Sequence, residues 1–162
     1  MKLLLTVGAQ MPFDRLVAGM DAWAAQNPGA RVTAQIGDST LHTAHLDAQR
    51  FLEPARFDQA CDEADAIVGH AGIGTLFAAL ERGKPVLVLP RRADLRETRN
   101  DHQLATARRF GERPGVVVVW EERELPDGLE RLQALVHAAP GVAQPALREG
   151  RLFDVIRDFV DT

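Results

Sequence analysis

The chain has 162 residues, of which 46% are hydrophobic and 26% are charged, and its formal net charge at pH 7 is −4. This length is enough for one well-buried core and too short for two ordinary domains, so we expect a single domain over residues 1–162. The acidic balance argues against a nucleic-acid partner, because binding to a phosphate backbone normally needs clustered basic residues. The single cysteine, Cys61, excludes a disulfide framework or a cysteine metal site and fits a reducing cytoplasm.

The first part of the chain predicts short buried strands that alternate with helices. Residues 3–7 are an apolar run that ends at Gly8, which favours a buried strand over a signal peptide because no small-residue cleavage site follows. Pro12 is expected to open a helix, since proline is well tolerated in the first turn, and apolar residues then recur at helical spacing. The next expected elements are a strand over residues 31–36, a loop over 38–47, a short strand over 49–52 and a helix over 54–63.

The second part continues this alternation. It begins with a strand over residues 64–68, a glycine-rich turn over 69–75 and a helix over 75–82 capped by Gly83. A strand over 86–89, a charged loop over 91–99 and a helix that begins near Asn100 or Asp101 follow. The last expected elements are a strand over 115–120 and helices over 125–137 and 146–160. The stretch 138–145 is the plausible linker. The last helix carries an apolar stripe, which either folds back on the domain's own core or serves as a partner-docking element. No apolar run approaches the ~20 residues that a membrane span needs.

Strands and helices in alternation, with strands that are apolar throughout, predict the α/β fold class. Such strands are buried on both faces, so the expected architecture is a Rossmann-like parallel sheet with helices on both faces. Sheets of this kind bind ligands outside the carboxyl ends of their strands, near the point where the strand order reverses. The loops that follow the strands are therefore the places to search for a site.

The turn from Gly69 to Thr75 is the most informative local feature. It follows a buried strand and opens a helix, so its backbone N–H groups and the helix dipole suit a diphosphate. Gly72 and Gly74 would let an anionic ligand approach without a Cβ in the way, and Thr75 adds a hydroxyl donor. The alternative is a tight turn that needs glycine only for its backbone dihedral angles.

Other chemistries find less support in the sequence. A dinucleotide fingerprint is incomplete, because the pattern around Gly72 and Gly74 lacks a third glycine and does not follow the first strand. No Walker loop is present, and Ser39, the single serine, does not lie in a nucleophile elbow. His42 and His45 have the spacing of metal ligands but no clear third ligand, so neither a metal nor a cofactor is expected.

A second polar cluster follows the strand over residues 86–89 and should lie beside the glycine turn. Its arginines would supply positive charge for phosphates, and its carboxylates and amides could hydrogen-bond to sugar hydroxyls. The residues concerned are Arg91, Glu97, Asn100, Asp101, His102 and Gln103. A solvated charged loop in front of a capped helix is the alternative.

Short segments in a fixed order resemble a known family. They are Thr6-Val7-Gly8, Pro12-Phe13-Asp14-Arg15-Leu16, Gln35-Ile36-Gly37, His70-Ala71-Gly72-Ile73-Gly74-Thr75, Gly83-Lys84-Pro85, Pro90-Arg91-Arg92 and Asn100-Asp101-His102-Gln103. Together they look like the C-terminal-type domain of glycosyltransferase family 28, over residues 1–120. More narrowly, they resemble the small donor-binding subunits of two-component transferases, which serve in eukaryotic lipid-linked oligosaccharide synthesis and in bacterial exopolysaccharide and capsule assembly.

This resemblance implies one half of a GT-B fold that binds a UDP-sugar donor. The residues that would hold the diphosphate are Gly8, Ala9, Gln10, His70, Ala71, Gly72, Ile73, Gly74 and Thr75, and those that would meet the donor sugar are Asn100, Asp101, His102 and Gln103, with Arg91 and Glu97 completing the donor-binding set. Main chain near Phe51 and Leu52 would border the uracil. No catalytic residue is assigned, since the general base would lie on a partner and His70 is only a positional candidate.

The implied activity is an inverting transfer of a sugar, without a required metal, to a lipid-diphosphate-linked saccharide acceptor in exopolysaccharide or capsule synthesis. The implied partner is a membrane-anchored, acceptor-binding subunit that would hold this cytoplasmic chain at the inner face of the membrane. The alternative is a non-catalytic nucleotide-sugar-binding module that enhances a separate transferase. A dinucleotide-dependent oxidoreductase, which would bind NAD in preference to UDP, is the third hypothesis.

The chain departs from the family at one position. Many relatives carry a glutamate that binds the ribose hydroxyls five residues before the equivalent of Gly83, where this chain has Ala78. Glu81 lies nearly a turn away from that position. Ribose recognition is therefore expected to be weaker, or to have moved to another residue such as Glu97.

Overall fold

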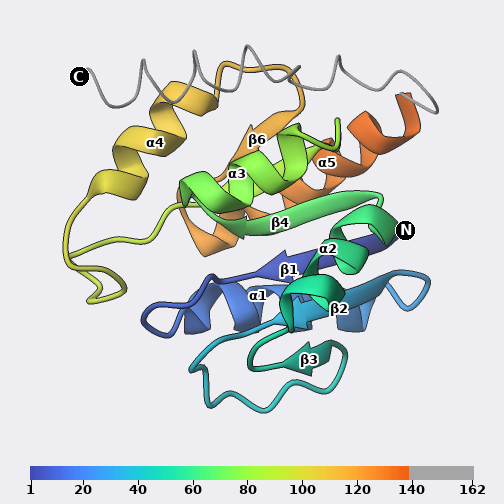
Figure 1. The fold of residues 1–162 in the computed structure, drawn as a ribbon, viewed down its shortest axis with the longest axis horizontal. Helices are drawn as coiled ribbons and strands as arrows, with labels where there is room; N and C mark the ends of the chain where they lie inside the picture. Colours follow the sequence, from blue (N-terminus) through green and yellow to red (C-terminus); the bar gives the residue numbers. More distant parts are fainter. Residues whose placement is uncertain (139–162) are drawn as a thin grey trace.

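Residues 1–138 are described by the structure, a computed structural model, and they form an α/β fold around one sheet (Figure 1). The strands are β1 (Lys2–Thr6), β2 (Arg31–Gln35), β3 (Asp47–Gln49), β4 (Ala66–His70), β5 (Val86–Leu89) and β6 (Val116–Val118). The helices are α1 (Asp14–Gln26), α2 (Pro54–Glu63), α3 (Ile73–Leu80), α4 (His102–Phe110) and α5 (Leu125–Ala138), with a 3-10 turn at Glu122–Glu124. The helix predicted over 146–160, with its apolar stripe, lies outside the described residues.

Neighbouring strands of the sheet are parallel, and their order is β3-β2-β1-β4-β5-β6. The chain places β2 and β3 on one side of β1 and then crosses to the other side for β4, β5 and β6. The order therefore reverses between β1 and β4, where Thr6 pairs with Gly69. In sheets of this kind, the crevice outside the carboxyl ends at that point is where ligands bind.

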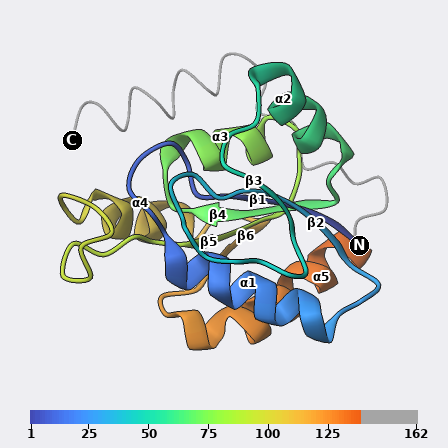
Figure 2. The same ribbon diagram turned by 90° about the horizontal axis from the view of Figure 1, so that it is seen from below.

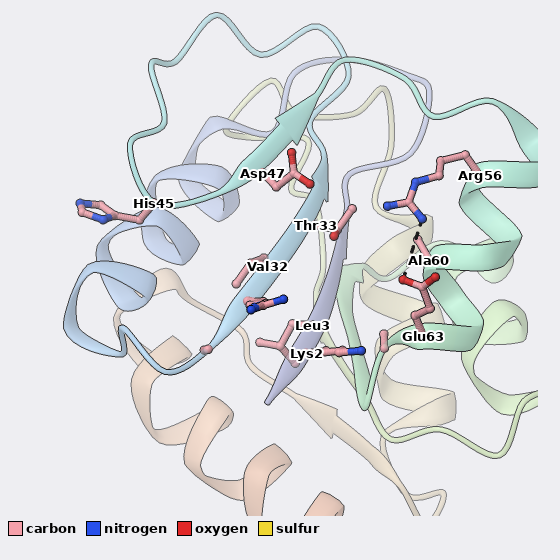
Figure 3. Close-up of a pocket in the computed structure, with 12 residues that line it drawn as sticks. Lys2, Leu3, Val32, Thr33, His45, Asp47, Arg56, Ala60 and Glu63 are labelled. Carbon is pink, nitrogen blue, oxygen red and sulfur yellow. Dashed lines mark ion pairs between the residues drawn. The ribbon is translucent and has the colours of Figure 1, made fainter.

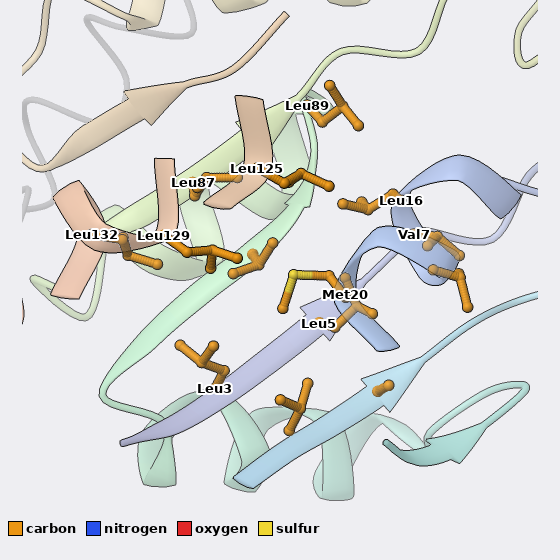
Figure 4. Packing of buried hydrophobic residues seen from close by; sticks show 14 of the residues in the cluster. Leu3, Leu5, Val7, Leu16, Met20, Leu87, Leu89, Leu125, Leu129 and Leu132 are labelled. Atoms are coloured by element: carbon orange, nitrogen blue, oxygen red, sulfur yellow. The ribbon is translucent and has the colours of Figure 1, made fainter. Parts of the chain in front are cut away.

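Helices cover both faces of the sheet, which explains why its strands are apolar throughout (Figure 2). On one face, α1 and α5 pack on the strands, and Leu5 shares a core cluster with Met20 and Leu129 (Figure 4). On the other face, α2, α3 and α4 pack in a second cluster that contains Leu4 and Leu76. Successive residues of β1 thus enter opposite cores, as the pleat of a strand requires. The predicted Rossmann-like sheet is confirmed.

Two predicted boundaries differ from the structure for local reasons. β3 covers residues 47–49 and not the expected 49–52. The Leu52 amide does not pair with a neighbouring strand, because it donates to the Gln35 side chain at 3.0 Å. α1 does not start at Pro12, because Phe13 has a φ of −132° and a ψ of 60°, which are not helical angles. α2 and β5 have the predicted bounds.

Candidate functional site

Two loops leave the sheet side by side where the strand order reverses. One follows β1 and runs over residues 8–11, and the other joins β4 to α3 at Ala71 and Gly72. Because β1 and β4 are neighbouring parallel strands, both loops emerge at the carboxyl edge of the sheet. A third loop, residues 90–101, follows β5, the other neighbour of β4. Most of the residues expected in the site lie on these three loops.

The glycine turn is shorter than the predicted segment 69–75. The first two residues of that segment complete β4, and α3 begins at Ile73, so the turn itself is reduced to Ala71 and Gly72. Gly69 is needed for packing, because a Cβ there would lie 2.6 Å from the carbonyl oxygen of Thr6. The prediction of a turn over the whole segment is therefore wrong, because strand pairing with β5 extends β4.

The first turn of α3 offers unpaired amides. Gly72 is the N-cap residue, and its carbonyl accepts from the amides of Thr75 and Leu76 at 3.1 and 3.2 Å. Within the described residues, the amides of Ile73 and Gly74 have no hydrogen-bond partner. A Cβ on Gly74 would have no atom within 4 Å. The helix therefore presents free N–H donors, and the positive end of its dipole, to an open surface.

The imidazole of His70 lies between the two loops. A Cβ on Gly8 would lie 2.6 Å from the ring atom Nε2, and a Cβ on Gly72 would lie 2.1 Å from the ring atom Cε1. Gly8 also has a φ of 75°, in the region that favours glycine. Both glycines are thus required by close packing on the same ring. Packing therefore explains Gly8 and Gly72, while the unpaired amides of Ile73 and Gly74 stay open to a ligand.

The surroundings of His70 keep its ring uncharged. Burial in the first place, and the charge of Arg91 in the second, lower the pKa of His70 from 6.5 to about 4, against an opposing hydrogen bond with the Gln103 side chain. Its Nδ1 atom is buried and has no hydrogen-bond partner among the described residues. Buried polar atoms without partners are rare in folded proteins. At neutral pH, His70 is therefore a neutral imidazole with one nitrogen that residues 1–138 leave unpaired.

Arg91 lies beneath the loops and does not face outward. It is 1% exposed, and its guanidinium donates to the carbonyl oxygens of Val7 at 2.7 Å, Pro12 at 2.9 Å and Glu97 at 2.9 Å. The guanidinium carbon lies 4.7 Å from the centre of the Phe13 ring. The expectation of a phosphate-facing arginine is corrected here, because main-chain carbonyls already use its donors. Any effect of Arg91 on a ligand is indirect.

Glu97 is tied into the same network. Its carboxylate accepts from Arg15 Nε at 2.5 Å, from Arg15 Nη2 at 3.0 Å and from the Arg92 amide at 3.0 Å. The expected contact of Glu97 with a sugar or ribose is therefore not supported, because the carboxylate is already paired. Arg15 was not expected to pair with Glu97 on sequence alone. The available signal was its position in the first turn of the helix after β1, which starts at the carboxyl edge of the sheet.

The polar residues at the start of α4 shape the loop after β5. Asn100 Oδ1 accepts from the His102 amide at 3.3 Å, and Asp101 Oδ1 accepts from the Ala93 amide at 3.1 Å. The side chains of Asn100, Asp101 and His102 are exposed. These three residues therefore lie on the surface of the loop that borders β4 and its turn.

The remaining expected residues are divided between surface and interior. Ala9 and Gln10 are exposed, and their amides have no partner among the described residues. Thr75 is buried, with its methyl group toward β4. Gln103 is half-buried, and its Oε1 accepts from the Arg91 amide at 3.1 Å. Gln103 therefore links α4 to both the arginine and the imidazole described above.

The sequence matches the family model of the glycosyltransferase family 28 C-terminal domain over residues 3–143. The chain belongs to this family. The match includes all three loops of the carboxyl edge, so the geometry described above is the geometry of a family 28 domain. No curated protein matches the chain.

Solved structures share the fold of this family 28 domain. The glycotransferase of kitacinnamycin is 18% identical with a TM-score of 0.67, and the match covers 97% of this chain and 42% of that one. ALG13 is 19% identical with a TM-score of 0.58, over 82% of this chain and 85% of that one. Os79 from O. sativa in complex with UDP is 14% identical with a TM-score of 0.57, and the match covers 99% of this chain and 40% of that one. The chain thus spans less than half of the first and third proteins. The expected resemblance to the family, and to one half of a GT-B fold, is confirmed.

Ala78 lies where the resemblance implies a ribose-binding glutamate. It follows Gly74 by one helical turn on the same side of α3, close to the free amides, and its methyl group cannot hydrogen-bond to a ribose. Glu81 is the C-cap residue of α3 and lies two turns from Gly74, about 10 Å along the helix axis. Glu97 is already paired with Arg15, and Glu81 lies at the opposite end of α3 from the free amides.

Phe51 and Leu52 lie at the far end of the same edge. They follow β3, the outermost strand, which is separated from β1 by β2. With strands about 4.8 Å apart, this places them roughly 10 Å from the loop after β1. Phe51 is 48% exposed, whereas Leu52 is buried.

A cavity of about 410 Å³ lies at the amino ends of β1 and β2, beside α2 (Figure 3). None of the expected donor-binding residues lines it. Its charged lining has both signs, because Lys2, Arg31 and Arg56 meet Asp47 and Glu63, and Arg56 pairs with Glu63 at 3.9 Å. A mixed lining of this kind does not favour a diphosphate.

Residues 1–138 contain neither a candidate metal site nor a membrane-spanning helix. No group of three or more His, Cys, Asp or Glu side chains there is placed to hold a metal ion. No helix of that part is both long enough and apolar enough to cross a bilayer. Cys61 is buried and free, and burial raises the pKa of its thiol, so it is a core residue with little nucleophilic character.

Proposed function

We propose that this domain binds a UDP-sugar and forms the donor half of a glycosyltransferase. The observation that carries the proposal is the presence of two sets of free amides, those of Ala9 and Gln10 and those of Ile73 and Gly74, on neighbouring loops where the strand order reverses. Amides arranged in this way bind phosphate groups well. Membership of glycosyltransferase family 28 supports the reaction, and the complex of Os79 with UDP supports the nucleotide.

In the proposed reaction, this domain stabilises the leaving group. An inverting transfer breaks the bond between the sugar and the diphosphate, so negative charge grows on the diphosphate as the acceptor attacks. Fixed N–H donors stabilise that charge without reorganising, and they do so without a required metal. His70 lies at the junction of the loops, but its ring is half-buried and packs so closely on Gly8 and Gly72 that neither has room for a Cβ. The general base is therefore assigned to the acceptor side.

The acceptor half is proposed to be a membrane-anchored partner. The matched region spans 42% of the kitacinnamycin glycotransferase and 85% of ALG13, so this domain corresponds to one part of the first protein and to most of the second. In the proposal, the partner binds a lipid-diphosphate-linked saccharide, as in exopolysaccharide or capsule synthesis. It also holds this chain at the cytoplasmic face of the membrane.

Calorimetric titration tests nucleotide binding. UDP should bind, and NAD should not. Gly74→Asp places a carboxylate in the open space in front of the amides, so it should abolish UDP binding and leave the fold intact. Gly29→Asp is the matched control, because a Cβ on Gly29 also has no atom within 4 Å and Gly29 lies in the α1–β2 turn, at the amino end of the sheet. Unchanged UDP affinity in the Gly74 variant would remove this turn from the site.

A non-catalytic nucleotide-sugar-binding module is the second candidate function. It is favoured by Ala78, because a domain without the ribose-binding glutamate is expected to hold its nucleotide less tightly. Reconstitution with an acceptor-type protein encoded beside this chain separates the two candidates. If this domain is the donor half, sugar transfer by the pair disappears with Gly74→Asp. If it is an enhancing module, the partner retains transfer activity without it.

A further inference from the structure

The loop over residues 8–11 carries half of the proposed diphosphate site but makes few bonds of its own. The Gly8 amide donates to Thr6 Oγ1 at 3.3 Å. The amides of Ala9, Gln10 and Met11 have no partner within residues 1–138, and all three residues are exposed. A short exposed loop with so few bonds samples many conformations unless its ends are fixed.

One buried side chain fixes both ends of this loop. Val7 immediately precedes the loop and Pro12 immediately follows it, and their carbonyl oxygens accept from Arg91 Nη2 at 2.7 Å and Arg91 Nη1 at 2.9 Å. Nη1 also donates to the Glu97 carbonyl at 2.9 Å, which ties the loop to the segment after β5. A planar guanidinium, here stacked on the Phe13 ring, can bridge three acceptors in this way, whereas a lysine ammonium is a compact point charge.

A second arginine, Arg15, lies beside Arg91 and pairs with Glu97 at 2.5 Å and with Glu122 at 3.4 Å. Arg15 and Arg91 both lie against the Phe13 ring, at 5.2 and 4.7 Å from its centre. Glu97 is the buried carboxylate among the described residues, and its oxygens contact Arg15. Arg91 itself donates to neutral carbonyls and forms no ion pair in that part of the chain. A buried cation without a carboxylate contact is costly, and a nearby anionic ligand would offset that cost.

We propose that Arg91 is a positioning residue that holds the 8–11 loop against His70, so that the amides of both loops converge on one diphosphate. Its charge favours the anion from beneath the loops, without contact. Gly8 packs against the His70 ring, and Gly72 packs against the same ring. The position of the 8–11 loop therefore affects the position of the second set of amides. This inference rests on the proposed function and adds the residue that assembles its site.

Arg91→Lys tests the geometric part of the inference, because it keeps the charge and loses the three-way bridge. UDP affinity should fall about tenfold or more. Arg15→Lys is the matched control in the same cluster, since Arg15 donates to Glu97, Glu122 and the Pro90 carbonyl and not to the 8–11 loop. Its UDP affinity should stay within about threefold of the wild type. Leu132→Ala, in the core beneath α5, controls for lost stability, and it should leave UDP affinity unchanged.

Two further readouts separate positioning from a general loss of stability. In Arg91→Met, the His70 pKa followed by NMR should rise, because the neighbouring charge is gone, whereas Arg91→Lys should keep it low. In the wild-type protein, UDP should shift the amide signals of Ala9, Gln10, Ile73 and Gly74 with one dissociation constant. The wild-type titration tests the convergence of the two loops even if the Arg91 variants do not fold.

Two results would overturn the inference: wild-type UDP affinity in a folded Arg91→Lys variant, or UDP-induced shifts confined to the α3 turn. Absence of UDP binding in the wild-type protein would instead refute the proposed function. The same wild-type experiment with inorganic pyrophosphate then decides the inference alone, because it supplies the diphosphate without the nucleoside. Pyrophosphate should still shift the amides of both loops together, and shifts in one loop only would contradict convergence.

Discussion

His70 is a residue whose chemistry is set by its burial. Its ring lies between two glycine backbones, its Nδ1 has no partner among the described residues, and its pKa is lowered to about 4. As the pH falls, such a ring is protonated near pH 6.5 in the unfolded chain but only near pH 4 in the folded protein. His70 therefore links the shape of the loops to pH.

The first prediction concerns this linkage. Above pH 6.5 the ring is neutral in both states, so the full stability is present. As the pH falls from 6.5 toward 4, the unfolded chain binds a proton that the folded protein does not, so the free energy of unfolding falls, by about 2 kcal/mol between pH 7 and pH 5. Urea unfolding of the wild type and of His70→Gln at both pH values should show this loss in the wild type alone. An equal change in the two proteins would assign the pH dependence to other groups.

The second prediction concerns Ala78. Because it lies one turn from Gly74 on the same side of α3, Ala78→Glu should place a carboxylate within reach of a ribose bound at the free amides. A charged hydrogen bond to the ribose should strengthen UDP binding about fivefold to tenfold in calorimetry. Glu81→Ala should leave the affinity unchanged, since Glu81 lies two turns away. If Ala78→Glu gained nothing, or gained equally for a 2′-deoxy nucleotide, the nucleoside would have to lie elsewhere.

At the scale of elements, α3 and α5 each contain a glycine, but for different reasons. Gly74 in the first turn of α3 has no atom within 4 Å of the position of a Cβ. Gly128 in α5 lies against the sheet, where a Cβ would be 2.5 Å from Val119 and 2.9 Å from Leu87. Close packing thus explains the second glycine and leaves the first without a structural reason. An anion in front of α3 would supply one.

The third prediction follows from this contrast. Gly74→Ala should stabilise the protein by up to about 1 kcal/mol, because it lowers the entropy of the unfolded chain and creates no clash. Gly128→Ala should destabilise it by about 1–3 kcal/mol despite the same helix propensity, because α5 would have to move off the sheet. Urea unfolding measures both changes. Destabilisation by Gly74→Ala would indicate a packing role that the structure does not contain.

The sequence predicts most elements because their signals are local. The four residues of β5 are apolar and buried, and Pro54 opens α2 at a position that proline prefers, so both elements have the predicted bounds. The end of β4 was not predicted because Gly69 and His70 become strand through pairing with neighbouring strands, Gly69 with β1 and both residues with β5. That pairing depends on the fold and leaves no mark in the segment itself.

The arrangement of the loops around the candidate site was predictable, but the contacts of their side chains were not. Loops after parallel strands meet at one edge, which is why the turns near Gly8 and Gly72 were expected together. The burial of Arg91 and the pairing of Glu97 were not predictable, because they depend on Val7 and Arg15, which lie 84 and 82 positions away. Charged residues in a loop look alike in sequence, whether they face a ligand or hold the loop in place.

At the scale of the whole molecule, the exposed large hydrophobic side chains of the described part are concentrated on one edge. They are Met11, Leu41, Phe51, Leu95 and Trp120. Each lies in a connection that leaves the carboxyl end of a strand, and the candidate site lies at that same edge of the sheet. Exposed apolar groups near a polar site are typical of a surface that another protein covers. This arrangement agrees with an acceptor-binding partner that closes over the donor.

The fourth prediction tests that surface. Leu95 is 47% exposed on the loop after β5, and Leu95→Ser should weaken the complex with the acceptor-type partner about tenfold, because an apolar contact at the interface is lost. UDP affinity of the isolated chain should stay within about twofold, since the amides that hold the diphosphate are untouched. Ala25→Ser is the control, because Ala25 is exposed near the end of α1, at the opposite edge of the sheet. Copurification and calorimetry of the pair measure both effects. Equal partner binding by both variants would mean that the partner does not cover this edge, and the donor would then have to be closed off by another surface.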